Sequence, residues 1–256
     1  MSVVDTSPFG RGLRHWRRIR GVSQLDLATT AATTTRHVSF LETGRSRPSR
    51  EMVDRLGDAL TIPLRERNRL LEMAGLAPAY VEGDLDSQDL APFQAAIDRL
   101  LAAHEPYPGF VLDRHWNITR TNLGSELFLA NFDGRNLIEL ALGAWRPMID
   151  NWTAVVNALK ERVAADLLRF PADDALADLH DRLGQALGPA GQRTEPSTSR
   201  VICPHFNIDG TTIRTITVAA RFESVADITL DEIRVELIYP EDHISERFFR
   251  EQAAEL

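Results

Sequence analysis

Cys203 and His205 are the residues whose types and spacing come nearest to a catalytic or metal-binding arrangement. A nucleophilic cysteine needs a base and a group that orients this base, and a metal site needs three or four ligands. Cys203 is the only cysteine, and His205 follows two residues later on an expected strand, so both side chains would point to the same face. We expect a buried structural pair. Because the sequence also has no glycine-rich phosphate loop and no nucleophile elbow, we expect no enzymatic activity, no cofactor and no metal site.

The arginines of the N-terminal part offer a different chemistry, which is binding rather than catalysis. A guanidinium group pairs with phosphate and can also bond O6 and N7 of guanine together. Residues 1–80 contain thirteen arginines, no lysine and eight acidic residues, which gives a net charge of +5, whereas residues 81–256 carry −13. A basic N-terminal region followed by an acidic C-terminal region is typical of a protein that binds DNA through the N-terminal region alone.

Short helices must position these arginines. Ser23 is typical of a helix start, the threonine run 33–35 predicts a second start, and Gly44 predicts the end of that second helix. Pro48 and Ser49 open the next helix, and residues 64–74 make a further one. Apolar residues at helical spacing would form a small core, namely Leu13, Trp16, Val22, Leu25, Ala28, Val38, Leu41, Met52, Val53, Leu56 and Leu60. This predicts an all-α domain over residues 1–80.

This N-terminal stretch resembles the DNA-binding domain of the Xre (lambda-repressor-like) helix-turn-helix family over roughly residues 9–75. The matching residues are Arg17, Gly21, Ser23, Gln24, Leu27, Ala28, Leu41, Glu42, Gly44, Pro48 and Ser49. The resemblance implies that the second helix of the motif enters the major groove. It implies base contacts from Thr34, Thr35, Arg36 and Ser39, and phosphate contacts from Gln24, Arg14, Arg17, Arg45 and Arg47. The implied partner is a double-stranded DNA operator, bound by a homodimer.

Residues 81–256 predict a second domain of the α+β class with an antiparallel sheet. A linker helix over 81–105 carries an apolar stripe that could pack on this domain or form a dimer seam. Strands are expected within 106–121, joined at Asp113–Arg114, and helices over 122–130, 152–170 and 174–187. Residues 188–199 predict an exposed loop. Strands over 200–208 and 211–222 flank Asp209–Gly210, a strong hairpin signal, and a last strand covers 233–239.

The order of these elements is typical of a PAS-like sensor domain, and the closer resemblance is to the MmyB-like ligand-binding domain. The residues that carry it are Asp113, Arg114, Trp116, Asn117, Asn122, the segment 146–152, Thr229, Leu230, Glu236 and the segment 240–242. The segment 143–145 departs from the pattern. The resemblance implies a pocket for a small hydrophobic ligand, with fatty acids as the leading class. Candidate lining residues are Trp116, Phe128, Trp145, Arg146, Met148, Trp152, Phe206 and Phe222.

Two hypotheses follow for the function. The first is a sequence-specific transcription regulator whose C-terminal domain senses a small hydrophobic ligand. The second is a DNA-tethered protein-interaction module, such as an antitoxin or co-regulator, which should show an exposed apolar patch instead of a cavity. Since no apolar run approaches the roughly 20 residues of a membrane span, we expect a cytoplasmic protein.

Overall fold

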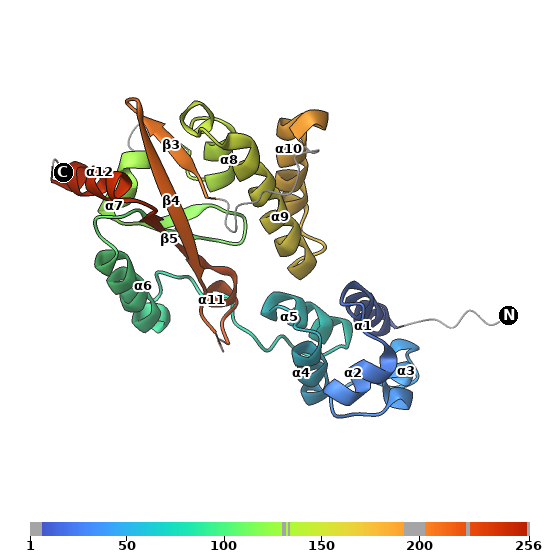
Figure 1. The fold of residues 1–256 in the computed structure, drawn as a ribbon. Coiled ribbons are helices and arrows are strands. Elements are labelled where there is room, and N and C mark those ends of the chain that lie inside the picture. Colours follow the sequence, from blue (N-terminus) through green and yellow to red (C-terminus); the bar gives the residue numbers. More distant parts are fainter. Residues whose placement is uncertain (1–6, 130–131, 133, 192–202, 224–225, 255–256) are drawn as a thin grey trace. The chain divides into compact units, whose positions relative to one another are not determined.

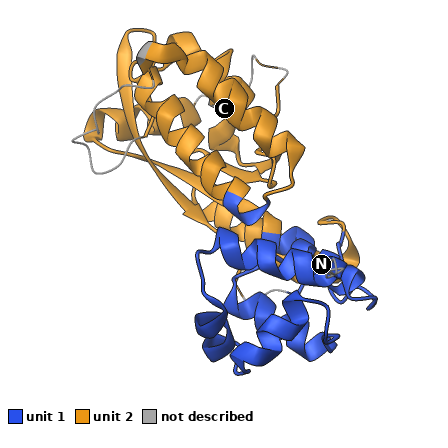
Figure 2. Cartoon of the chain, turned by 90° about the vertical axis from the view of Figure 1, so that its right-hand side faces the viewer, with its two compact units in different colours: residues 1–83, 168–170, 224–231 blue, residues 84–167, 171–223, 232–256 orange. Residues whose placement is uncertain are grey.

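The computed structural model describes residues 7–129, 132, 134–191, 203–223 and 226–254. The chain divides into two compact units (Figure 2). The first comprises residues 1–83 with 168–170 and 224–231, and the second comprises 84–167, 171–223 and 232–256. The first unit runs a little past the expected boundary at residue 80, because Val81 pairs with Asp227 and the amide of Gly83 donates to the Asp227 carboxylate at 3.0 Å.

Five helices form the main part of the first unit (Figure 1): α1 (Pro8–Ile19), α2 (Gln24–Thr30), α3 (Thr35–Glu42), α4 (Arg50–Ala59) and α5 (Leu64–Met73). The side chains of Ser23, Thr34 and Ser49 each accept a backbone N–H in the first turn of the helix that follows. This confirms the three predicted helix starts. Gly44 has a φ of 74°, which allows the chain to turn sharply after α3.

The apolar faces of these helices meet in one core that includes Leu13, Trp16, Val38, Leu41 and Leu56. Leu25 was expected there but is 63% exposed. Residues two positions apart on a helix point to nearly opposite sides, and the inward face of α2 is taken by Leu27 and Ala28.

The second unit is built on a five-stranded antiparallel sheet (Figure 1). Its order is β2 (Ile118–Thr121), β1 (Gly109–Leu112), β5 (Arg234–Pro240), β4 (Thr211–Ala220) and β3 (His205–Ile208). Asp209 and Gly210, with φ values of 49° and 80°, form the two-residue turn between β3 and β4. The predicted hairpin and the α+β class are confirmed, whereas the expected strand start at residues 200–202 lies outside the described residues.

Helices pack around this sheet, and their bounds are α6 (Ala91–Ala103), α7 (Leu123–Leu129), α8 (Leu137–Leu142), α9 (Trp152–Arg169), α10 (Asp174–Gly191) and α12 (His243–Ala253). The short helix α11 (Ile228–Glu232) belongs almost wholly to the first unit, which includes residues 224–231. Short 3₁₀ turns cover Gln88–Leu90 and Arg146–Met148. The helices α8, α11 and α12 were not expected from the sequence. The predicted stop at Gly188 is confirmed, because the backbone is non-helical there, with φ 60° and ψ −178°, and a separate short helical segment follows to Gly191. The rest of the expected loop lies in the undescribed stretch 192–202.

The two faces of the sheet carry different helices. Gly109 on β1 has no side chain, and an added Cβ would lie 2.8 Å from Leu101 of α6, so α6 packs directly on this strand. The opposite face looks toward α8 and α9. Among the described residues, no helix is long and apolar enough to cross a bilayer.

Candidate functional site

The residues expected to read bases lie at the start of α3. Thr34, Thr35 and Arg36 are exposed and Ser39 is half-buried. The Thr34 hydroxyl accepts the amide of His37 at 3.1 Å and so fixes the first turn of this helix. The structure thus brings the four residues together on one helix, and their contact with DNA remains a prediction.

Phe40 organises two exposed arginines next to this helix start. The guanidinium carbon of Arg36 lies 5.0 Å from the centre of the Phe40 ring, and that of Arg45 lies 5.8 Å from it. The Arg45 amide donates to the Phe40 carbonyl at 2.8 Å, which holds the loop after α3 against the same residue. A guanidinium group on an aromatic face loses part of its conformational freedom. Arg47 is exposed on the same loop.

Glu42, at the end of α3, is the centre of a buried polar network. Its side chain is 1% exposed and accepts hydrogen bonds from Arg17 Nε at 2.6 Å and from Gln24 Nε2 at 2.8 Å. Arg14 Nε lies 3.3 Å from the same carboxylate. Burial alone would raise the pKa of Glu42, but the hydrogen bonds from Arg17 and Gln24 and the charge of Arg17 outweigh it, and the pKa is lowered.

This network changes the interpretation of three expected phosphate contacts. Arg17 is 15% exposed and directs its N–H groups to Glu42 and to the carbonyl of Val22. Arg14 and Gln24 also bond to Glu42. The structure therefore gives these side chains a role in joining α1, α2 and α3, which the sequence did not indicate. Arg45 and Arg47 remain the better placed candidates for phosphate binding.

Arg36→Ala is expected to weaken specific DNA binding by roughly 1–3 kcal/mol and to relax one base position, because a base contact is lost. Arg47→Ala serves as the control and should weaken binding to all sequences about equally. The measurement is fluorescence anisotropy with a duplex selected from a random library and with a scrambled duplex. An equal loss on both duplexes for Arg36→Ala would contradict base recognition.

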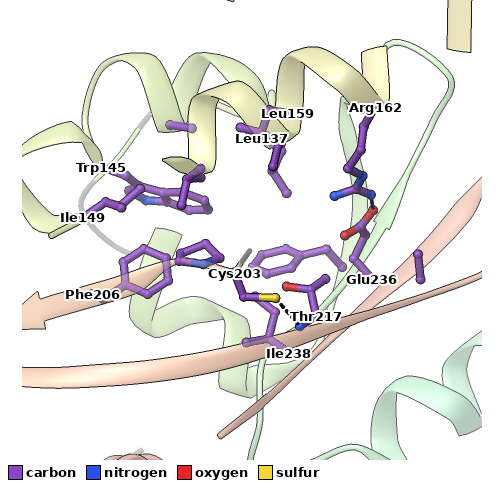
Figure 3. A pocket seen from close by; sticks show the side chains of 16 residues that line it. Leu137, Trp145, Ile149, Leu159, Arg162, Cys203, Phe206, Thr217, Glu236 and Ile238 are labelled. Carbon is purple, nitrogen blue, oxygen red and sulfur yellow. Dashed lines mark hydrogen bonds and ion pairs between the residues drawn. The ribbon is translucent and has the colours of Figure 1, made fainter. Parts of the chain in front are cut away.

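A cavity of about 260 Å³ lies in the second unit between the sheet and the helices α8 and α9 (Figure 3). This is slightly below the roughly 300–1,000 Å³ of typical small-molecule sites, so it suits a small ligand. Its lining is Phe110, Leu137, Ala141, Trp145, Ile149, Val155, Ala158, Leu159, Arg162, Cys203, Pro204, Phe206, Thr217, Ala219, Glu236 and Ile238.

One end of the cavity is aromatic. The rings of Trp145 and Phe206 lie 5.9 Å apart and nearly perpendicular, at 87°. The Trp145 Nε1 donates to the carbonyl of Phe128 at 3.0 Å, which satisfies the polar atom of the indole and leaves apolar surface for a ligand.

The other end is polar and is formed by Arg162 of α9 and Glu236 of β5, whose side chains face each other in Figure 3. Glu236 is 3% exposed, whereas the Arg162 side chain is 39% exposed. Between the two ends, the Cys203 sulfur accepts the backbone N–H of Thr217 at 3.2 Å. The arrangement suits a ligand that is mostly apolar with a polar group at one end.

Two of the eight expected lining residues, Trp145 and Phe206, lie in the cavity wall. The expectation is corrected for the other six. Phe128 packs behind Phe206 at 4.7 Å, and Phe222 packs against Phe93 at 5.5 Å. The Trp116 ring is covered by Arg234, whose guanidinium carbon lies 3.7 Å from the ring centre. The guanidinium carbon of Arg146 lies 4.4 Å from the centre of the Trp152 ring, and Trp152 Nε1 donates to the Ala141 carbonyl at 2.8 Å. Met148 lies in the 3₁₀ turn.

The sequence missed Arg162, Glu236, Thr217 and Cys203 as cavity residues. Alternation along β4 and β5 was the available signal, because Thr217 and Ala219 share one face of β4 and Glu236 and Ile238 share one face of β5. The expectation of a buried pair at Cys203 and His205 holds only for Cys203, since the His205 side chain is 36% exposed. No group of metal-ligating side chains occurs among the residues that the structure describes.

Comparison with known families agrees with this geometry. Residues 93–251 match the family model of the MmyB-like transcription regulator ligand binding domain, and residues 8–70 match that of a helix-turn-helix domain. The first of these models describes a domain of transcription regulators. A comparison with curated proteins finds no match.

Proposed function

The chain belongs to the family with the MmyB-like transcription regulator ligand binding domain, preceded by a helix-turn-helix domain, and we propose that a small hydrophobic ligand in its cavity controls its binding to an operator. The observation that carries this proposal is an apolar cavity with one polar end in the same chain as a helix-turn-helix domain whose helix α3 begins with exposed residues. Fatty acids are the leading ligand class. The proposal places the protein in the cytoplasm, where its DNA lies.

The DNA side of the proposal is a homodimer on a two-fold operator. Helix-turn-helix readers of this kind bind half-sites about one helical turn apart. Thr34, Thr35, Arg36 and Ser39 would read bases, and Arg45 and Arg47 would hold phosphates. A ligand changes DNA affinity only if it binds two conformations of the protein differently.

Native mass spectrometry of the purified protein, compared with its denatured mass, tests the ligand. We expect a dimer that carries a small extra mass for each subunit. Ala158→Trp places a large side chain in the cavity wall and should remove this mass and the effect of ligand on DNA affinity. Ala165→Trp, at an exposed position of the same helix, is the matched control and should keep both.

A protein-interaction module remains the second candidate, because the outward face of the sheet shows apolar residues. Ile216, Val218 and Tyr239 are 40%, 46% and 40% exposed, and Ile216 pairs with Tyr239 across β4 and β5. This candidate is favoured if the wild-type chain carries no extra mass and Ala158→Trp leaves DNA binding unchanged under all ligand conditions.

A further inference from the structure

The polar end of the cavity is an ion pair between groups of very different burial. The guanidinium of Arg162 hydrogen-bonds to Oε1 of Glu236, and only the carboxylate is nearly inaccessible, at 3% against 39% for Arg162. Arg162 therefore already binds one carboxylate, that of Glu236, in the wall of a cavity whose lining is mostly apolar.

Arg234 gives Glu236 a second cationic partner, which contacts the same carboxylate oxygen as Arg162. Arg234 is 3% exposed, and its Nε lies 3.2 Å from the same Oε1. Neither this Nε nor one terminal nitrogen of Arg234 has a hydrogen-bond partner within the described part of the chain. The other terminal nitrogen bonds to Asp166 at 3.0 Å. Burial lowers the pKa of Arg234 against the opposing charges of Asp166 and Glu236.

The Trp116 ring packs against the faces of both guanidinium groups, so that their edges point to the carboxylates. Its ring is fully buried, and the guanidinium carbons of Arg234 and Arg162 lie 3.7 Å and 4.6 Å from its centre. A guanidinium stacked on an indole presents its N–H groups sideways, where carboxylates bind. One carboxylate thus faces two guanidinium groups, of which the buried one has unused donors.

We propose that Arg162 anchors the acidic head of the ligand, and that Glu236 is an internal carboxylate which the ligand displaces from Arg162 onto Arg234. This assignment rests on the proposed function, since it names the residue that would bind the polar group of a ligand in the same cavity. Buried donors that lack partners are costly, so the move of Glu236 to Arg234 offsets the loss of its bond to Arg162. The head is a carboxylate, because a carboxylate of the protein itself already fits Arg162.

Three probes with the same chain and different heads test this assignment on the full-length protein, from which bound lipid has been removed. Decanoate is anionic, decanol is neutral and decylamine is cationic. Isothermal titration calorimetry should show that decanoate binds about tenfold or more tightly than decanol, as a charge-assisted contact requires. If decanol or decylamine binds as tightly as decanoate, the anchor is wrong although the apolar-ligand function stands. If none of the three binds, both proposals fall.

Variants then separate the two roles. Arg162→Gln should reduce decanoate binding to the level of decanol and leave decanol unchanged, whereas Glu236→Gln should strengthen decanoate binding because Arg162 is released. Arg182→Gln, which alters an exposed arginine paired with Glu139 at 3.0 Å, is the control and should change nothing. Weaker decanoate binding in a folded Glu236→Gln protein would overturn the displacement. The comparison of the three probes on the wild-type protein decides the anchor even if a variant does not fold.

Discussion

Glu42→Ala should lower the free energy of unfolding of the first unit by about 3 kcal/mol, near the low end of the range for a broken buried ion pair. The variant removes the common partner of Arg14, Arg17 and Gln24. Arg14 and Arg17 are 34% and 15% exposed, so both regain some water, which limits the loss. Native-state hydrogen exchange of amides in α1 and α3 measures the change in the intact chain.

Glu51→Ala is the matched control, because Glu51 is an exposed carboxylate in the first turn of α4. Its removal should cost less than about 1 kcal/mol. Equal losses in the two variants would contradict the role of Glu42 as the centre of the network.

The same carboxylate gives the first unit a defined acid sensitivity. The folded pKa of Glu42 lies below its ordinary value of 4.5. A lowered carboxyl pKa means that its stabilisation is complete above the unfolded pKa and is lost as the pH falls through the folded pKa. Wild-type protein should therefore lose stability below about pH 4.5, and Glu42→Ala should lack this part of the loss.

Local signals explain why the helix-turn-helix could be predicted so closely. Ser23, Thr34 and Ser49 each bond to an amide within their own first turn, so three or four residues of sequence are enough to identify them. Glu42 is different, because its partners come from α1 and α2 and lie as many as 28 residues away. A single sequence shows an acid at that position but not the three donors around it.

The cavity shows a second limit of sequence reasoning. Large aromatic residues were expected to line it, yet most of them fill space between the elements, as Phe128 and Trp152 do. The wall needs small side chains that leave room, and Ala141, Ala158 and Ala219 supply them. Small residues are common throughout helices and strands, so their meeting around one space depends on strand register, which only the folded chain reveals.

The strand segments and the β3–β4 hairpin could be predicted from the sequence, but several of the helices could not. The Asp209–Gly210 turn and the alternation after it determine the β3–β4 hairpin through local conformation. The helix α12 was missed although Asp242 caps it, because its apolar face is short and follows a strand directly. The Phe249 side chain of this helix is fully buried, and its ring centre lies 5.9 Å from that of Tyr107. These two residues lie near opposite ends of the sequence of the second domain.

Arg234→Met should be the most damaging single change in the second unit. It leaves the buried carboxylates of Asp166 and Glu236 without the cation between them, and the expected loss is about 3–5 kcal/mol of unfolding free energy. The protection of β5 amides against hydrogen exchange measures it. Arg221→Met, which alters a 35% exposed arginine that faces the same Asp166 at 3.4 Å, is the control and should cost less than about 1 kcal/mol.

A further variant separates the loss of packing from the loss of charge. If unpaired carboxylates cause the damage, Arg234→Met combined with Asp166→Asn and Glu236→Gln should be more stable than Arg234→Met alone, because no buried charge remains. If the triple variant is instead less stable, the remaining pairs of Asp166 with Arg221 and of Glu236 with Arg162 contribute more than the burial of the two charges costs. In that case the two carboxylates stabilise the second unit even without Arg234.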